Sequence, residues 1–388
     1  MAARVMDGRQ WKLHKVIRSE WRLFPVWGVV LVAGSMSAGA RHGAIGDGPA
    51  FAVFLVLFVT VLAAAFAVVR HAEALAHRLG EPYGTLLLTL AVITMEVSII
   101  TAVMVAGKDQ PTMARDTLYA VIMLVMNGLV GVALLMGGLR HREQVYNLNG
   151  TSTYLALILP LSVIALVLPN YTHATRDPTF SLGQAAVVGT MTLVLYAIFL
   201  AVQTVRHRDF FDPPDAAEAG HLSAPVAELP SDGSPRAVVK PSILMLLYLV
   251  PVILLAKFLA GPIEHGISDL GWPIELGGVL IAALILSPEA LSALRAALDN
   301  ELQRAINVFL GSVTATIGLT VPAVLGVSLI TGEPLLLGLN AEQSLLLFLT
   351  LAVSMVTYSS GRTNVLLGAV HLTLFAVYLM LVFDLSAL

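Results

Sequence analysis

Two glutamates stand in the middle of long apolar stretches of the sequence. Glu96 lies within GTLLLTLAVITMEVSIITAVM, and Glu289 ends the otherwise uncharged run LGGVLIAALILSPE. A charged side chain facing lipid costs at least ~3 kcal/mol, so such carboxylates normally face protein or a water-filled cavity. Carboxylate and hydroxyl oxygens suit Ca²⁺ or alkali cations rather than Zn²⁺ or copper. The pair predicts a cation site, and the alternative is two acids buried only for helix packing.

Backbone and hydroxyl oxygens are predicted around Glu289. Pro288 removes a backbone donor and frees a carbonyl, so we expect the helix to break or kink beside the carboxylate. In the next apolar segment Ser312, Thr316 and Thr320 follow one another at four-residue steps and share one helix face. This hydroxyl stripe is predicted to face the acids.

Five polar residues are candidates for supporting ligands. A hydroxyl stands two residues before each glutamate, and three further polar residues lie on the following helices; the set is Thr94, Ser287, Asn127, Ser312 and Thr316. Small polar residues also hydrogen-bond between membrane helices, and this structural role is the alternative for the last three. Thr85, Thr89 and Glu96 are spaced by four and seven residues and should share one polar face.

Three residues are candidates for the path of protons or cations: His71, Glu73 and Asp116. His71 and Glu73 belong to a group with His77 and Glu81 that reads as a solvated loop, and proton entry or pH sensing is the second interpretation. For Asp116 the first interpretation is that it caps its helix or lines the outer entry, and binding of the ion is the alternative. His371, in the last apolar segment, is predicted to be a packing residue.

The composition is that of a polytopic membrane protein. Of the 388 residues 57% are hydrophobic and 12% charged, against about 25% charged in soluble domains. The net charge of −3 and the lack of a basic tract give no indication of nucleic-acid binding, and the absence of cysteine excludes disulfides and thiolate chemistry. We expect no cleavable signal peptide, because the first twenty residues are polar and basic.

An all-α fold of about eleven membrane helices is predicted at roughly 20 apolar residues per span. The expected ranges are 22–40, 48–69, 84–107, 116–138, 152–169, 181–204, 241–260, 273–294, 304–330, 343–360 and 364–384. With a cytoplasmic N-terminus, all but five of the 22 lysines and arginines lie inside, the exceptions being Arg41, Lys108, Arg115, Arg176 and Lys257. The positive-inside rule therefore predicts a cytoplasmic N-terminus and an external C-terminus.

One long acidic, proline-rich connection divides the chain. The expected parts are a cytoplasmic tail at 1–21, helices one to six at 22–204, a linker at 205–240 and helices seven to eleven at 241–388. The linker reads as a disordered connection, and a cytoplasmic cation-sensing segment is the alternative.

The two parts carry an internal repeat. The third and eighth helices each hold a central glutamate, each is followed by a short charged loop, and the loop count gives them opposite directions. A shift of 189 residues places Arg115 on Arg304 and Asn127 on Thr316. Such pairs are typical of inverted-repeat transporters with a site at the repeat interface. We predict two inverted repeats of five helices plus one extra N-terminal helix.

Two buried carboxylates of this kind allow ion exchange without a nucleotide. Burial in general raises the pKa of a carboxylate and a bound cation lowers it, so protons and cations compete for the same oxygens. A site that opens to one side at a time then exchanges one for the other. The chain has no GxxxxGK[ST] loop, and neither a nucleotide nor a cofactor is predicted.

The stretches 76–100 and 286–322 resemble the Ca²⁺:cation antiporter superfamily, and within it the ChaA-type proton antiporters of bacterial inner membranes. The resemblance implies Ca²⁺/H⁺ or Na⁺(K⁺)/H⁺ exchange across that membrane, with Glu96 and Glu289 as the ion-binding acids. It also implies that Ser312, Thr316 and Asn127 hold family ligand positions. Many relatives place G-N-A-x-E at the glutamate, where this chain has AVITME and LILSPE.

The predicted function is a cation/proton antiporter that exports Ca²⁺. A Na⁺(K⁺)/H⁺ antiporter with little Ca²⁺ transport is the main alternative. A channel would need a wide polar pore or a carbonyl filter, and an intramembrane enzyme would need a nucleophile with its base or a metal motif such as HExxH; neither pattern occurs. The expected partners are the bilayer, cations and protons, with homo-oligomerisation left open.

Overall fold

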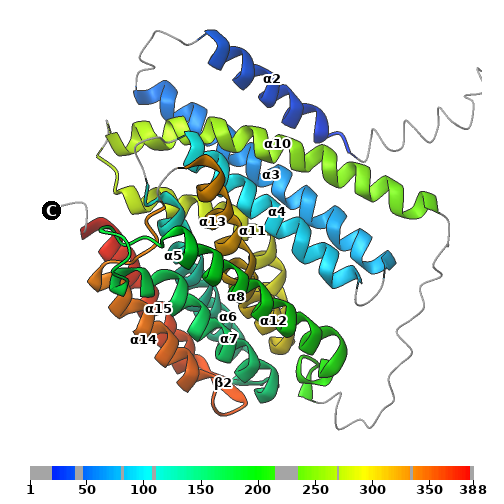
Figure 1. Ribbon diagram of the computed structural model, residues 1–388. Helices are drawn as coiled ribbons and strands as arrows, with labels where there is room; N and C mark the ends of the chain where they lie inside the picture. Colours follow the sequence, from blue (N-terminus) through cyan, green and yellow to red (C-terminus); the bar gives the residue numbers. More distant parts are fainter. Residues whose placement is uncertain are drawn as a thin grey trace, which may run out of the picture.

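The computed structural model describes residues 20–39, 47–79, 83–106, 111–214, 235–268, 271–332 and 335–384. Within these ranges the chain forms the eleven expected apolar helices, three of them ending in or interrupted by a short π-helical segment (Figure 1). Eight are long and apolar enough to cross a membrane, and three are shorter apolar helices. The predicted all-α membrane class and helix number are confirmed.

The helices lie at the following positions. They are α2 (Leu23–Gly39), α3 (Asp47–Leu79), α4 (Tyr83–Ala106), α5 (Met113–Met123) continued by η1 (Leu124–Leu129) and α6 (Val130–His141), α7 (Leu148–Leu166), α8 (Leu182–Ala201) continued by η3 (Val202–Arg206), α10 (Pro235–Ser268), α11 (Ile274–Leu298), α12 (Leu302–Ala315) continued by η5 (Thr316–Thr320) and α13 (Val321–Thr331), α14 (Ala341–Thr357) and α15 (Val365–Asp384). Short 3-10 turns occur at Leu168–Tyr171 (η2) and Arg208–Phe210 (η4).

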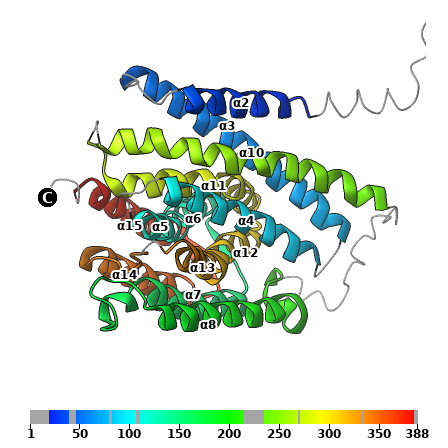
Figure 2. The ribbon, with the colours of Figure 1, turned by 45° about the horizontal axis from the view of Figure 1, so that its top comes forward.

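The bundle is layered around the helices that carry the glutamates. α2 lies at one edge beside α3 and α10, and α7 and α8 lie at the opposite edge (Figure 2). Between these edges, α4 and α11 each pack against α3 and α5. One apolar core joins α4 to α8 and α11 to α15, while a second joins α2, α3 and α10 to the other side of α4 and α11. Glu96 and Glu289 therefore sit on the two helices where both cores meet.

Two helix predictions need correction. α3 continues to Leu79, ten residues beyond the expected end at 69, so His71, Glu73 and His77 lie on a helix rather than in a loop. α11 passes Pro288 without a break, because membrane helices tolerate proline where neighbouring groups satisfy the freed carbonyl. The irregular backbone lies instead at the π segments η1 and η5, in the helices that follow α4 and α11.

A two-stranded ribbon was not predicted. β1 (Glu143–Val145) pairs antiparallel with β2 (Arg362–Asn364), with Gln144 opposite Thr363. The buried Gln144 amide donates to the Ala297 carbonyl at 2.8 Å and to Asn300 Oδ1 at 3.1 Å. The ribbon thus fastens the loops after α6 and α14 to the end of α11. Strands of three residues give too short a pattern for sequence-based prediction.

Two of the three π segments, η1 and η5, occur at related positions of the two halves. The shift of 189 residues that places Asn127 on Thr316 also makes η1 overlap η5. π-bulges are rare and frequently mark functional sites. This correspondence supports the predicted repeat, whose inverted layout stays a prediction.

Candidate functional site

Glu96 and Glu289 line one cavity of about 250 Å³, here called the central cavity. Glu96 projects from the middle of α4 and is 2% exposed. Glu289 projects from α11, and the two carboxylates are close enough for their charges to interact. The prediction that the two acids meet in space is confirmed by this geometry.

The hydroxyl stripe of α12 and η5 reaches both acids. Thr316 Oγ1 donates to Glu96 Oε2 at 3.0 Å, and the Ser312 hydroxyl lies near the Glu289 carboxylate and interacts with it. Thr320 lies near Glu96 and interacts with it, although its buried hydroxyl oxygen lacks a hydrogen bond of normal geometry. One helix face therefore connects the two carboxylates through hydroxyls one turn apart.

Each acid keeps one oxygen free for a ligand. Glu96 Oε1 and Glu289 Oε2 are buried and have no hydrogen-bond partner. Leaving a buried polar group unpaired costs on the order of 1–3 kcal/mol, and more when it is charged. Two free carboxylate oxygens in one cavity can be satisfied by protons or by a cation, which is the exchange chemistry expected of the pair.

Two predicted ligands do not belong to this site. Thr94 is exposed and its Oγ1 donates to the Leu90 carbonyl at 2.6 Å. The Ser287 hydroxyl donates to the Ala283 carbonyl of its own helix, and neither residue lines the central cavity. Residues two apart on a helix point in nearly opposite directions. A hydroxyl at that distance cannot share the face of the glutamate.

Asn127 also lies outside the central cavity. Its amide nitrogen donates to Thr350 Oγ1 at 2.8 Å, and its Oδ1 lies 3.3 Å from His371 Nδ1. The other ring nitrogen of His371 lies 2.9 Å from Thr357 Oγ1. His371, which is fully buried, is the packing histidine that the sequence predicted, and Asn127 is held in the same interhelical network.

Several polar residues of the central cavity were missed by the sequence. These are Gln203, Asn307 and Tyr196, which line it, and Tyr196 interacts with Thr89. Thr89 was expected on the face of Glu96, while the side chain of Thr85 lies outside the described residues. Gln203 donates to the Tyr154 hydroxyl and Asn307 to the Phe211 carbonyl. No periodic signal links Gln203 to the repeats, because it comes from the end of α8.

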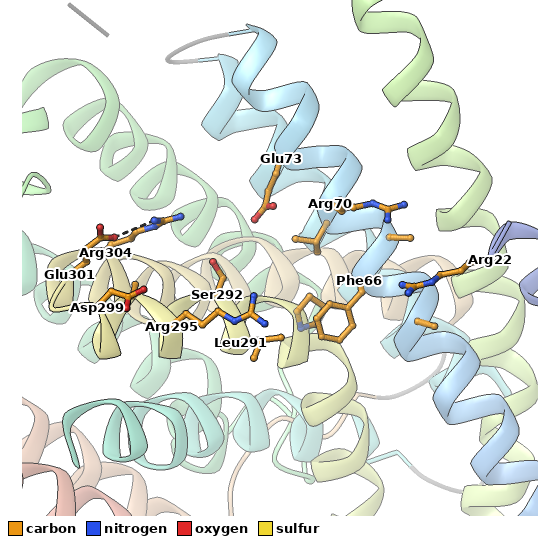
Figure 3. A pocket seen from close by; sticks show the side chains of 15 residues that line it. Arg22, Phe66, Arg70, Glu73, Leu291, Ser292, Arg295, Asp299, Glu301 and Arg304 are labelled. Carbon is orange, nitrogen blue, oxygen red and sulfur yellow. Dashed lines mark hydrogen bonds and ion pairs between the residues drawn. The ribbon is translucent and has the colours of Figure 1, made fainter. Parts of the chain in front are cut away.

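A second cavity of about 520 Å³, the entry cavity, adjoins the first at the Arg295 end of α11. Both cavities are lined by Val69, Glu73, Ser292 and Arg304. In Figure 3 the Glu73 carboxylate points from α3 toward the end of α11 that carries Ser292 and Arg295. Arg304 pairs with Glu301 at 3.2 Å. Glu73 thus stands where a path from this end reaches Glu289.

The other two path candidates take different positions. His71 is buried against Tyr248, with its Nε2 3.4 Å from Glu20 Oε2, and it lines neither cavity. Asp116 lies in the first turn of α5 and lines neither of these two cavities. Its Oδ1 pairs with Arg115 Nη2 at 2.8 Å. It does not cap its helix: Thr112 holds the cap position, and no side-chain capping bond forms there. Glu81 lies outside the described residues.

The ligands of the central cavity are hard oxygens. In the described part of the chain, no three histidine, aspartate or glutamate side chains converge into a metal-holding group. Two carboxylates, two hydroxyls and nearby amides suit a transported ion that binds and leaves, and match the preferences of alkali and alkaline-earth cations.

Loss of the Thr316 hydroxyl should slow exchange. Thr316→Val keeps the side-chain shape but removes the donor to Glu96, and a hydrogen bond to a charged group contributes about 1.5–3 kcal/mol. We expect roughly tenfold slower exchange in membrane vesicles. Thr94→Val is the matched control and should exchange like the unmodified chain. Equal rates for both variants would remove Thr316 from the site.

An eleven-helix bundle with two acids and a hydroxyl stripe around a buried cavity defines a membrane ion transporter. The chain belongs to the sodium/calcium exchanger protein family, whose model matches residues 49–205 and 240–383. It is similar to the "Sodium-potassium/proton antiporter ChaA" of Escherichia coli (strain K12), with 43% identity over 334 residues, 86% of this chain and 89% of the relative. It is also similar to the "Ca(2+)/H(+) antiporter ChaA" of Bacillus subtilis (strain 168), with 24% identity over 354 residues, 89% and 96% of the two chains.

Solved structures share the fold. Native YfkE matches with a TM-score of 0.68 at 17% identity, over 93% of this chain and 99% of that chain. The H⁺/Ca²⁺ exchanger CAX matches with a TM-score of 0.65 at 15% identity, over 95% and 91%. The expected membership of the Ca²⁺:cation antiporter superfamily is confirmed.

Proposed function

We propose that the chain is a secondary-active cation/proton antiporter in which cations and protons compete for Glu96 and Glu289. The free oxygens of the two acids in one cavity carry this proposal. Ser312 and Thr316 orient the carboxylates and supply neutral oxygens. The bilayer, cations and protons are its partners, and the family contains transporters rather than enzymes.

Na⁺ or K⁺ is the cargo that we propose first. The relative at 43% identity is named a sodium-potassium/proton antiporter, and Asn127, the amide expected at the site, is held elsewhere. Fewer oxygens around the acids favour a monovalent ion. Ca²⁺ is the second candidate, because two carboxylates balance its charge and more distant relatives are named for Ca²⁺/H⁺ exchange.

Everted membrane vesicles with an acid interior test the function and the cargo together. A pH-sensitive dye reports collapse of the proton gradient when Na⁺, K⁺ or Ca²⁺ is added separately. We expect a response to millimolar Na⁺ or K⁺, with the half-maximal concentration rising as the pH falls because protons occupy the same carboxylates. A response to micromolar Ca²⁺ alone would reverse the cargo assignment, and no response to any of the three would refute antiport.

We also propose that the protein lies in a bacterial inner membrane, with the Arg295 end of α11 on the cytoplasmic side. The distribution of lysine and arginine supports this orientation, with the central cavity then open to the inside. Because the chain has no cysteine, single cysteines report the topology cleanly. A membrane-impermeant thiol reagent should label Asp299→Cys only in everted vesicles and Glu342→Cys only in intact cells. The opposite pattern would invert the orientation.

A further inference from the structure

A third cavity lies at the other end of α5 and α11, far from the two glutamates. Its lining residues come from four helices: Asp116 and Tyr119 from α5, Glu275 from α11, Gln343 from α14, and Tyr378, Leu381 and Val382 from α15. Fourteen residues separate Glu275 from Glu289 along α11, which at 1.5 Å per residue is roughly 21 Å. This cavity, here called the Asp116 cavity, is therefore separate from the central cavity.

Two buried oxygens in the Asp116 cavity have no partner. They are Asp116 Oδ2 and the Tyr119 hydroxyl, on residues that are 2% and 3% exposed. Thr112 lies near the Asp116 carboxylate and interacts with it, yet Oδ2 stays without a hydrogen bond of normal geometry. Native structures rarely leave such groups unsatisfied, and each one calls for a ligand, a water or a functional reason.

The pairing of Arg115 explains why only one carboxylate oxygen is free. Its Nε and Nη2 both lie 2.8 Å from Asp116 Oδ1, and its Nη1 donates to the Gly338 carbonyl at 3.2 Å. All three guanidinium nitrogens are therefore engaged with Asp116 Oδ1 or the Gly338 carbonyl, and none makes a hydrogen bond to Oδ2. A Tyr119–Tyr378 edge-to-face contact, with ring centroids 5.5 Å apart, forms one wall of the cavity.

The charge and size of the cavity select its ligand. Asp116 and Glu275 line this cavity together, and Arg115 beside Asp116 carries one positive charge. A bound cation favours the ionised form of nearby carboxyl groups. With both acids ionised the net charge is minus one, which one monovalent cation neutralises, whereas a divalent ion would leave an excess. The cavity holds about 10 Å³, close to the volume that accommodates one water-sized particle.

We infer that the Asp116 cavity is a second cation site, which binds one desolvated Na⁺ or K⁺ between Asp116 Oδ2, Glu275 and the Tyr119 hydroxyl. It lies where the chain backbones approach closely: a Cβ on Gly278 of α11 would come within 2.7 Å of the Asp116 backbone. An ion bound there occupies the contact between the helix that carries Glu289 and its neighbour α5. This second binding site lies at the Glu275 end of α11, whereas the entry cavity lies at the Arg295 end.

The test measures thermal unfolding of purified protein in detergent, with Na⁺ or K⁺ replaced by N-methyl-D-glucamine at constant ionic strength. A cation that binds only the folded protein raises its Tm. The Glu96→Gln/Glu289→Gln double variant serves as the background, so that cation binding in the central cavity does not contribute to the Tm shift. A failure of the proposed antiport can then be told apart from a failure of this inference, which the Tm shift alone tests. We expect 100 mM Na⁺ or K⁺ to raise Tm by ~3–5 °C in this background.

Three further variants decide the assignment. Asp116→Asn added to the background should remove the shift, while Glu342→Gln, an exposed acid beside Gln343, should keep it. Tyr119→Phe, made in the unmodified chain as well as in the background, loses only an unsatisfied hydroxyl, so without cation its Tm should be at least as high. It should need several-fold more Na⁺ to reach the same Tm shift. Two results would overturn the inference: no cation-dependent change of Tm in the background, or a Tm shift that remains in both Asp116→Asn and Tyr119→Phe. A buried water would then be the occupant of the cavity.

Discussion

Replacement of either Glu96 or Glu289 by glutamine is expected to reduce exchange to background while the protein still accumulates in the membrane. Glutamine has nearly the shape of glutamate. At position 96 its carbonyl can accept the hydrogen bond from Thr316, and at position 289 it can face the nearby Ser312 hydroxyl. It cannot release a proton or carry the charge that binds a cation. The structural cost is therefore small and the functional cost complete.

The dye assay in everted vesicles measures exchange, and an immunoblot of the membrane fraction measures how much protein accumulates. Glu342→Gln is the control, because this acid is exposed in the first turn of α14 and lines none of the three cavities described above. It should transport at the unmodified rate. Near-normal exchange by either cavity variant would show that its carboxylate is a packing residue.

A single methyl group at Gly278 is expected to lower the stability of the folded protein by about 1–3 kcal/mol. A Cβ there would lie 2.7–2.8 Å from backbone atoms of Asp116 and Thr117. Backbone cannot move aside as a flexible side chain does, so α11 must shift away from α5. The shift also displaces Glu289, and exchange should fall together with Tm.

Gly261→Ala is the matched control for Gly278→Ala. Gly261 lies on α10, and a Cβ there meets no atom within 4 Å. Alanine favours a helix by up to about 1 kcal/mol over glycine, so this variant should have an unchanged or higher Tm. Thermal unfolding of both variants in the same detergent checks the prediction, and equal Tm values would contradict the close approach of α11 and α5.

The sequence by itself determined the class of the protein and the two acids of the candidate site. Long apolar segments require helices that satisfy their own backbone in lipid, and this rule placed all eleven. The cost of an intramembrane charge singled out Glu96 and Glu289. Four-residue spacing correctly placed Ser312 and Thr316 on the face that meets them.

The tertiary structure decided which neighbours the acids have. Proximity along the chain favoured Thr94 and Ser287, but the turn of the helix directs both away, whereas Thr316 reaches Glu96 from a helix 220 residues later in the sequence. The amide of Asn127 forms hydrogen bonds with Thr350 and His371 and not with the acids. Periodicity describes one helix at a time, and only the packing of several helices brings Asp116, Glu275 and Tyr378 around one cavity.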